Sequence, residues 1–454
     1  MDCCLSLCFK DGLVRLLYNL LFTILFVVGA PYYLWRLIRR GDWRRGFWER
    51  FGFYDPELGE WARRGPVIWI HAVSVGEVNL ALPLVERLQA ELTGEGYQFL
   101  LTTTTTTGMA TLTRRLPLGS RAIYYPVDLS PIVARALRTI EPSLVVLVEA
   151  EIWPNFIWQT GRKNIPVSLV NARLSERSCR GYGRFGFLFK PLFSEFSLIC
   201  AQTDADAQRW IQLGCQPEAV LVSGNMKFDA VDVDGPQRTD FSEILIGLGV
   251  RDCRVLVGGS THPGEEVMLV RVWRELRTEF DDLFLILVPR HMERGAALAM
   301  ELRVDGLKLV RRSELKGNWE QNSNAEPPEC LLIDTTGELL DAYRAADFVV
   351  VGKSFPMTIG GGQNPIEPVA LGKNVVVGPK MGNFTDVVRA LKAATALTQV
   401  PDERELKANL QKMLMQSESS VKSPWQTVIG QHGGSLLITT RALVSFLKKT
   451  SKTP

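Results

Sequence analysis

Residues 67–88 read VIWIHAVSVGEVNLALPLVERL: a continuous apolar run, a short turn, and then apolar residues at helical spacing. A strand buried on both faces has such a continuous run, which is typical of a parallel sheet covered by helices. Ser74 and Gly76 form the turn, and Glu77 opens the helix. Ligands of parallel sheets bind beyond the carboxyl ends of the strands. Glu77 is therefore expected to project into a binding site.

The same alternation of apolar runs and amphipathic stretches recurs in two series. Seven runs form the first series, at residues 67–73, 98–104, 121–127, 143–150, 166–172, 196–202 and 219–225. Six runs form the second series, at residues 253–259, 282–290, 307–312, 330–334, 347–353 and 374–379. The polar segment VDVDGPQRTD, residues 231–240, separates the series with its breakers Gly235 and Pro236. The pattern predicts an α/β fold with two Rossmann-like doubly wound domains that face a cleft.

A stretch without charge, LLYNLLFTILFVVGAPYYLW, lies between Arg15 and Arg36 and has about the ~20 residues that a bilayer-crossing helix needs. Aromatic residues close it, and basic residues follow: Tyr32, Tyr33 and Trp35, then Arg36, Arg39, Arg40, Arg44 and Arg45. This order predicts a membrane anchor with the rest of the chain in the cytoplasm. A cleaved signal peptide is the alternative, but no small-residue cleavage site follows. Pro31 is expected to interrupt the segment, which leaves spanning and interfacial placement both open.

The predicted domains are an anchor with a basic juxtamembrane segment at residues 1–50, a first Rossmann-like domain at 51–230, and a second at 231–454. An amphipathic stretch around Leu436 to Leu447 can form a helix that crosses back to the first domain. The polar segment 316–329 reads as a surface insertion without chemistry.

Composition excludes several classes of function. Lys and Arg number 52 against 49 Asp and Glu, and the net charge of +3 argues against a nucleic-acid-binding protein. Eight cysteines occur without a CxxC pair, and none of the four histidines has zinc-ligand spacing from a cysteine. Two Asp-x-Asp pairs, at 204–206 and 232–234, lie at a helix start and in the linker. We therefore expect no metal and no disulfide framework.

Ionisable residues follow the strands of the first series. Glu149 and Glu151 end a very apolar strand, where residues two apart share a face. Lys227 follows the last run and can meet a phosphate or a sugar carboxylate. Each has a structural alternative: Glu77 as an acid at a helix start, the other two glutamates as exposed loop acids, and Lys227 as a surface lysine.

Turns after strands of the second series combine small and polar residues. VLVGGSTHPGEE places Ser260 in a turn before a helix whose free N–H groups suit an anion, although it matches neither a P-loop nor GxGxxG. Arg290 can hold a phosphate. Gly337 and Glu338 begin a helix, and Gly362 belongs to a glycine turn. Asn364 and Glu367 can bind ribose hydroxyls. A cap or turn is the alternative for each.

Nine segments recur in order as in the 3-deoxy-D-manno-octulosonic acid (Kdo) transferases, and the chain after the anchor resembles this family. They are HAVSVGE, PVDL, EAEIWPN, NARLSERS, GNMKFD, STHPGEE, LVPRH, GELLDAY and GGQNPIEP. The resemblance implies a metal-independent, inverting glycosyltransferase of the GT-B fold in lipopolysaccharide biosynthesis. It also implies that the first domain takes a lipid A precursor and the second takes CMP-Kdo, at the cytoplasmic face of a bacterial inner membrane.

The resemblance also assigns roles to residues. Glu77 would deprotonate the acceptor hydroxyl, Glu149 or else Glu151 would stabilise positive charge on the sugar, and Lys227 would offset negative charge on the donor. The segments that match the family's CMP contacts are Pro289 with Arg290, Gly337 with Glu338 and Leu339, and Asn364 with Pro365, Ile366 and Glu367. Arg173 and Arg177 can meet an anionic group or pair at the surface.

Two residues depart from the family pattern. Gln363 stands where a histidine is usual, and Lys353 stands where a glycine is usual, so the donor contacts can differ. Two other functions stay open: a GT-B transferase with another nucleotide sugar and another lipid-linked acceptor, and a catalytically silent membrane-bound scaffold.

Overall fold

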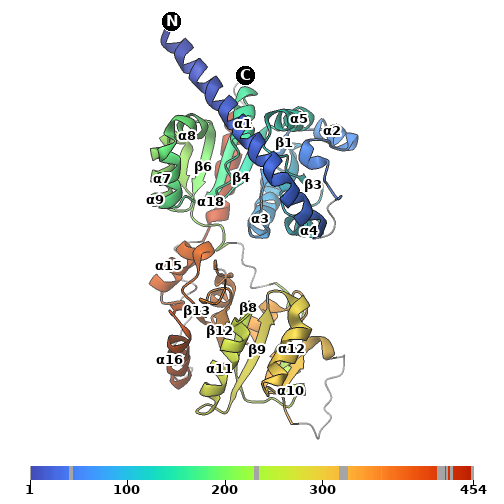
Figure 1. The fold of residues 1–454 in the computed structure, drawn as a ribbon, viewed down its shortest axis with the longest axis vertical. Helices are drawn as coiled ribbons and strands as arrows, with labels where there is room; N and C mark the ends of the chain where they lie inside the picture. The colour runs from blue at the N-terminus through green and yellow to red at the C-terminus, as the bar shows by residue number, and fades with distance from the viewer. Residues whose placement is uncertain are drawn as a thin grey trace. The chain divides into compact units, whose positions relative to one another are not determined.

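The computed structural model describes residues 2–39, 44–229, 235–315, 326–358, 360–416, 425, 428–429 and 433–450. It divides into two compact units, residues 1–230 with 432–454 and residues 231–431 (Figure 1). Each unit contains a seven-stranded sheet in which all pairs are parallel. The expectation of two parallel α/β sheets is therefore confirmed.

The sheet of the first unit has the strand order β3-β2-β1-β4-β5-β6-β7. Its strands are β1 (Val67–His71), β2 (Gln98–Thr103), β3 (Arg121–Tyr124), β4 (Leu144–Val148), β5 (Val167–Ala172), β6 (Phe196–Ala201) and β7 (Val220–Val222). Every residue of β1 and β4 is buried, as the apolar runs require. Alternate side chains enter two different cores: Trp69 one, and Ile68 and Ile70 the other.

Helices connect these strands. They are α2 (Pro56–Ala62), α3 (Val75–Glu91), α4 (Thr106–Arg115), α5 (Ser130–Ile140), α6 (Pro154–Arg162), α7 (Glu176–Arg184), α8 (Gly186–Phe193) and α9 (Asp204–Gln212). Because each connection runs from the carboxyl end of one strand to the start of a parallel neighbour, all the strand ends meet at one edge of the sheet.

The helix α18 (Ser435–Thr450) belongs to the first unit, although residues 231–431 form the second. It packs against α3, and Leu443, Val444 and Leu447 are buried in the same core as Leu84. Asp229 accepts hydrogen bonds from the backbone N–H groups of Gly434 at 2.6 Å and Leu436 at 2.8 Å. The second unit thus ends before the predicted boundary at 454, because the last helix buries its apolar face on the first.

The N-terminal helix α1 (Asp2–Arg39) is continuous. Pro31 lies inside it, so the expected interruption does not occur; a proline removes one backbone donor, and here the helix continues past it. The segment Val14–Tyr32 is long and apolar enough to cross a membrane, with a mean hydropathy of 1.8.

The sheet of the second unit has the order β10-β11-β9-β8-β12-β13-β14. Its strands are β8 (Arg254–Thr261), β9 (Leu283–Pro289), β10 (Leu309–Arg311), β11 (Cys330–Leu332), β12 (Phe348–Val351), β13 (Asn374–Val377) and β14 (Thr398–Gln399). Its helices are α10 (Phe241–Gly247), α11 (Glu265–Arg277), α12 (Gly295–Val304), α13 (Leu339–Arg344), α14 (Ile366–Ala370), α15 (Thr385–Ala393) and α16 (Glu403–Met415). Of the polar segment 316–329, residues 316–325 lie outside the described residues.

Candidate active site

Glu77 lies at the carboxyl edge of the first sheet, on the first turn of α3. Ser74 caps this helix: its Oγ accepts from the Glu77 N–H at 3.3 Å, and its hydroxyl donates to Oε1 of Glu77 at 2.8 Å. The backbone N–H of Val73 donates to Oε2 at 2.7 Å. This reciprocal cap folds the carboxylate back over the end of β1, so Glu77 is only 8% exposed.

The environment of Glu77 alters its acidity. Burial raises the pKa of Glu77 above its usual range, the hydrogen bonds from Val73 and Ser74 lower it, and the charges of Glu149 and Lys227 act in opposite directions. A carboxylate with a raised pKa is a stronger base than an exposed one. The side chain is therefore suited to accept a proton.

Glu149 and Lys227 form an ion pair beside Glu77. Oε1 of Glu149 lies 2.8 Å from Nζ of Lys227, and both side chains are largely covered, at 17% and 24% exposure for the lysine and the glutamate. Asn171, at the end of β5, donates from Nδ2 to the same oxygen at 3.5 Å. Its Oδ1 accepts from the backbone N–H of Met226 at 3.0 Å, which fixes the loop that carries Lys227.

The backbone at this edge has an unusual conformation. Glu149 and Asn171 adopt φ angles of 64° and 51°, in the left-handed region that non-glycine residues rarely occupy. Such a conformation directs each side chain away from the line of its strand. Strain of this kind is concentrated at functional sites, and here it turns Glu149 toward Lys227.

Glu151 is the third carboxylate of the cluster. The indole N–H of Trp153 donates to its Oε2 at 3.0 Å. Burial, followed by the charge of Glu77, raises the pKa of Glu151 to about 7. The structure thus brings together Glu77, Glu149, Glu151 and Lys227, four predicted site residues of the first domain. The protonation of Glu151 is therefore sensitive to pH near neutrality.

Arg173 and Arg177 are placed differently from each other. A pocket of about 220 Å³ lies beside Glu149, and Arg173 lines it together with Leu174, Ser175, Ser178, Tyr182 and Trp210. Arg177 is exposed on α7 and does not line this pocket. Only Arg173 is therefore positioned to meet a group that also approaches Glu149.

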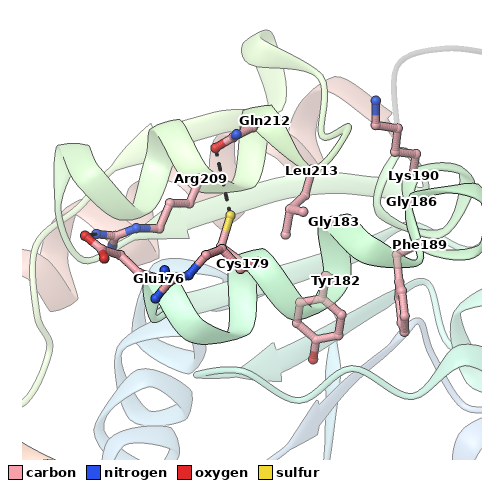
Figure 2. Close-up of a pocket in the computed structure, with 11 residues that line it drawn as sticks. Glu176, Cys179, Tyr182, Gly183, Gly186, Phe189, Lys190, Arg209, Gln212 and Leu213 are labelled. Carbon is pink, nitrogen blue, oxygen red and sulfur yellow. Dashed lines mark hydrogen bonds and ion pairs between the residues drawn. The ribbon is translucent and has the colours of Figure 1, made fainter.

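A larger groove of about 580 Å³ lies among α7, α8 and α9. Figure 2 shows its lining, where Cys179 of α7 faces Gln212 of α9, with 3.9 Å between Sγ and Oε1. Arg180, Lys190 and Arg209 give the groove basic character, and Arg209 pairs with Asp206 at 3.3 Å. Tyr182 lines both this groove and the pocket beside Glu149, so the two hollows adjoin.

In the second unit, Glu265 organises the turn between β8 and α11. Its carboxylate accepts four backbone hydrogen bonds, from His262 at 2.9 Å, Lys353 at 2.7 Å, Ser354 at 3.0 Å and Phe355 at 3.2 Å. Glu265 is 1% exposed. It therefore joins the loop after β12 to the loop after β8. Ser260, with a φ of 52°, lies within the last residues of β8, so the prediction that it lies in a turn is wrong.

Cationic and imidazole side chains surround His262 at the end of β8. Burial, followed by the charges of Lys353, His291, Arg290 and Arg294, lowers the pKa of His262 to about 4. Nε2 of Gln363 lies 3.2 Å from Nε2 of His262, which suits an amide donating to a neutral imidazole. The ring centroids of His262 and His291 are 5.6 Å apart. This edge of the second sheet is thus strongly positive and suits an anionic ligand.

The other predicted donor contacts lie around α13 and α14. The carboxylate of Glu338 accepts from Thr239 Oγ1 at 2.7 Å and from Arg312 at 3.0 Å, so its side chain is engaged within the unit. Gly337 has a φ of 85°, and Leu339 begins α13.

The Asn-Pro-Ile-Glu segment is held by its own side chains. Asn364 donates to Oε1 of Glu367 at 3.1 Å and accepts from the backbone N–H of Ile366, with Pro365 between them as the N-cap of α14. Burial raises the pKa of Glu367. A Cβ at Gly362 would lie 2.3 Å from Sδ of Met381, so only glycine fits there.

No metal site is apparent in the described part of the chain, where no three His, Cys, Asp or Glu side chains group as ligands. Asp206 of the first Asp-x-Asp pair accepts from the backbone N–H of Leu174 at 2.9 Å instead. Asp232 and Asp234 lie outside the described residues. Metal independence therefore stays a prediction.

Three residues of the site are not predicted by the search for ionisable groups at strand ends: Asn171, His262 and Glu265. Asn171 is neutral, Glu265 belongs to a helix start in the sequence pattern, and His262 has no zinc-ligand spacing. The signal that identifies them is their place at the carboxyl ends of strands: Asn171 in the last residues of β5, His262 directly after β8, and Glu265 at the start of the helix that follows β8.

A family profile described as "3-Deoxy-D-manno-octulosonic-acid transferase (kdotransferase)" matches residues 45–230. The 3-deoxy-D-manno-octulosonic acid transferase of Haemophilus influenzae is 33% identical, over 84% of this chain and 86% of that protein. The protein of the same name from Bordetella pertussis is 34% identical, over 82% of this chain and 85% of that protein.

Among solved structures, the UDP-GlcNAc 2-epimerase of Neisseria meningitidis bound to UDP-GlcNAc has a TM-score of 0.56 at 14% identity, over 84% of this chain and 100% of that chain. At this identity the likeness concerns the fold alone. It confirms the predicted GT-B class of two Rossmann-like units.

Proposed function

Because this chain belongs to the Kdo transferase family of glycosyltransferases, we propose that it transfers Kdo from CMP-Kdo to a lipid A precursor in lipopolysaccharide biosynthesis. The first unit supplies the acceptor site and the base. The second unit binds the donor through its positive edge around His262.

The geometry of Glu77 carries this proposal. A buried carboxylate with a raised pKa, fixed by two hydrogen bonds at the carboxyl edge of a parallel sheet, has the properties of a general base. Its cap to Ser74 explains the helix start but leaves the burial unexplained, because an acid that only complements a helix dipole is stable while exposed.

The reaction then proceeds as a single displacement. Glu77 takes the proton of a glucosamine hydroxyl while that oxygen forms a bond to the anomeric carbon of Kdo. The bond from the anomeric carbon to the phosphate oxygen breaks on the opposite face, and CMP leaves with the electron pair. The configuration at the anomeric carbon is inverted, and no metal is required.

Charged neighbours stabilise the transition state. Glu149, or else Glu151, lies near the positive charge that develops on the sugar, and Lys227 offsets negative charge on the donor phosphate or carboxylate. In the second unit, Ser260, Arg290 and the segments 337–339 and 364–367 hold the CMP moiety. Lys353 and Gln363 adjust these contacts around His262.

A phosphorylated glycolipid fits the hollows of the first unit. Arg173 lines the pocket beside Glu149, and Arg180 and Lys190 line the adjoining groove, so anionic groups of the acceptor have cationic partners. The apolar helix α1 attaches the enzyme to the inner membrane, where its substrate lies, with both units on the cytoplasmic face.

The test combines an assay with a variant pair. Purified protein is incubated with CMP-Kdo and a tetraacylated lipid A precursor, CMP release is measured, and added sugars are counted by mass spectrometry. Glu77→Gln is expected to lower kcat by about 10²–10⁴. Glu86→Gln, an exposed position on the same helix, serves as the control and retains activity.

Other outcomes would reject the proposal. Turnover of UDP-sugars in place of CMP-Kdo would identify another GT-B transferase. No turnover of any nucleotide sugar by a folded protein would favour the silent scaffold. Wild-type activity in Glu77→Gln would show that Glu77 is not the general base.

A further inference from the structure

One face of α1 contacts the first unit through specific polar groups. The hydroxyl of Tyr18 donates to Oδ2 of Asp128 at 3.1 Å, and Nδ2 of Asn19 donates to Oδ1 of Asn155 at 3.0 Å. Asp128 and Asn155 are 1% and 2% exposed. Asp128 also accepts from the backbone N–H groups of Asn155 and Phe156, so Tyr18 adds to a carboxylate that the first unit already holds in place. The two bonds from α1 to buried side chains of fixed position define one orientation of the helix on the unit.

Aromatic contacts extend the same face along the helix. The guanidinium of Arg15 lies 5.4 Å from the Trp158 ring, and Tyr18 packs edge-on against this ring at 5.4 Å. Further along, Phe26 meets Phe51 at 6.5 Å. The contacting residues follow Arg15 by three, four and eleven positions, which places all of them on one face of a helix. Figure 1 shows α1 passing across the first unit.

The opposite face of α1 is apolar and exposed. Its residues, each at least half exposed, are Leu16, Leu17, Leu20, Leu21, Ile24, Leu25, Val27, Val28, Tyr32, Trp35 and Ile38. So long an exposed apolar stripe is unfavourable in water and indicates a partner.

The length of the contact limits how α1 meets a bilayer. From Arg15 to Phe26 the helix is held against protein over about 17 Å, at ~1.5 Å per residue. The remaining part up to Arg39 is only about 20 Å long, whereas a hydrocarbon core is about 30 Å thick. The part before Arg15 contains Lys10 and Asp11. A spanning helix would therefore need to detach Tyr18 and Asn19 from buried partners.

We infer that α1 lies in the plane of the membrane interface, docked on the first unit, with its exposed stripe among the lipid chains of one leaflet. This inference rests on the membrane attachment in the proposed function and specifies its geometry. An amphipathic surface helix of this kind binds through its buried apolar area and through attraction to anionic lipids.

Residues next to α1 fit a lipid surface. Trp48 and Phe53 are 65% and 53% exposed, their rings lie 5.9 Å apart, and Trp48 packs on Phe51, the partner of Phe26. The body of the unit thus exposes two aromatic rings close to the docked helix. Arg45 is exposed, and the guanidinium of Arg135 lies 4.1 Å from the Phe53 ring, so cations border this surface as anionic headgroups require.

Sidedness tests the inference directly. The full-length protein carries one cleavable tag ahead of Met1 and another after Pro454, and protease is added to sealed inverted and right-side-out vesicles. An in-plane helix gives both tags the same accessibility in each preparation, whichever face the protein occupies. Tags on opposite sides would overturn the inference and leave membrane attachment intact. If the protein does not float with the vesicles in a density gradient, both the in-plane placement of α1 and the membrane attachment are wrong.

Cross-linking supplies a second measurement on membrane-bound protein. In a chain with Cys3, Cys4 and Cys8 replaced by serine, the pair Asn19→Cys and Asn155→Cys is oxidised in vesicles. The matched control pair is Leu20→Cys and Asn155→Cys, which places the thiol on the exposed stripe. We expect at least a tenfold higher cross-linked fraction for the first pair. Equal fractions would mean that α1 leaves the first unit in the membrane.

Discussion

The ammonium of Lys227 lies 2.8 Å from Oε1 of Glu149, although β5 and β6 separate the two strands that these residues follow. The loop after β7 must therefore return across two strand ends. Asn171 holds it there by accepting the N–H of Met226. The result is a cation placed among three carboxylates, whose charges it partly balances.

Removing this cation is expected to change the pH dependence of the reaction. Burial and the charge of Glu149 raise the pKa of Glu77, while the hydrogen bonds from Val73 and Ser74 and the charge of Lys227 lower it, so Lys227→Met removes one of the lowering influences and should raise this pKa further. The base acts only when deprotonated, and activity falls as the pH drops through its pKa. The acid limb of the kcat/KM profile should therefore move to higher pH. Lys163→Met, an exposed position, is the control; identical limbs in both variants would contradict the charge coupling.

Glu265 is expected to be essential for the stability of the second unit. In Glu265→Gln one acceptor oxygen is replaced by an NH₂ group that faces backbone donors, and each unsatisfied buried donor costs about 1–3 kcal/mol. We expect the free energy of unfolding to fall by about 2–5 kcal/mol in urea titrations. Glu301→Gln, exposed on α12, should change it by less than about 0.5 kcal/mol. If the two variants lose the same free energy of unfolding, the four hydrogen bonds of Glu265 contribute little to stability.

Lys353 adopts an unfavourable backbone conformation, and its ammonium lowers the pKa of His262. Two substitutions separate these two effects. Its φ of 57° disfavours side chains, so Lys353→Gly should be more stable than Lys353→Ala by about 1 kcal/mol. Both remove the ammonium that lowers the pKa of His262, so both should raise that pKa from about 4 and raise the KM for the donor equally. NMR titration of the histidines and donor kinetics measure this. A KM change in only one variant would refute the electrostatic role.

The last helix is expected to stabilise the first unit. Leu443 is fully buried in the core that contains residues of α3, so Leu443→Ala should cost about 2–5 kcal/mol and speed hydrogen exchange in α3. Ile438→Ala, 45% exposed on the same helix, is the control. Faster hydrogen exchange in α11 with no change in α3 would contradict this prediction, because α11 belongs to the second unit.

The sequence predicts the strands well because burial on both faces imposes a continuous apolar run such as SLVVLVEA. It also places Glu77, Glu149 and Glu151 at one edge, since parallel strands end together. It does not predict that Lys227 reaches Glu149, because that depends on the path of a loop across β6 and β5. The hydrogen bond from Tyr18 to Asp128 likewise joins residues 110 positions apart, and no local sequence pattern predicts it.

The position of α18 in the sequence also determines when the first unit can complete its folding during synthesis. The strands of the first unit are complete once β7 has emerged, but the helix that covers α3 is encoded after the whole second unit. At ~5–20 residues per second, synthesis of the intervening segment takes roughly 10–40 s. Throughout that interval the nascent chain exposes the apolar surface of α3 that α18 covers in the folded protein.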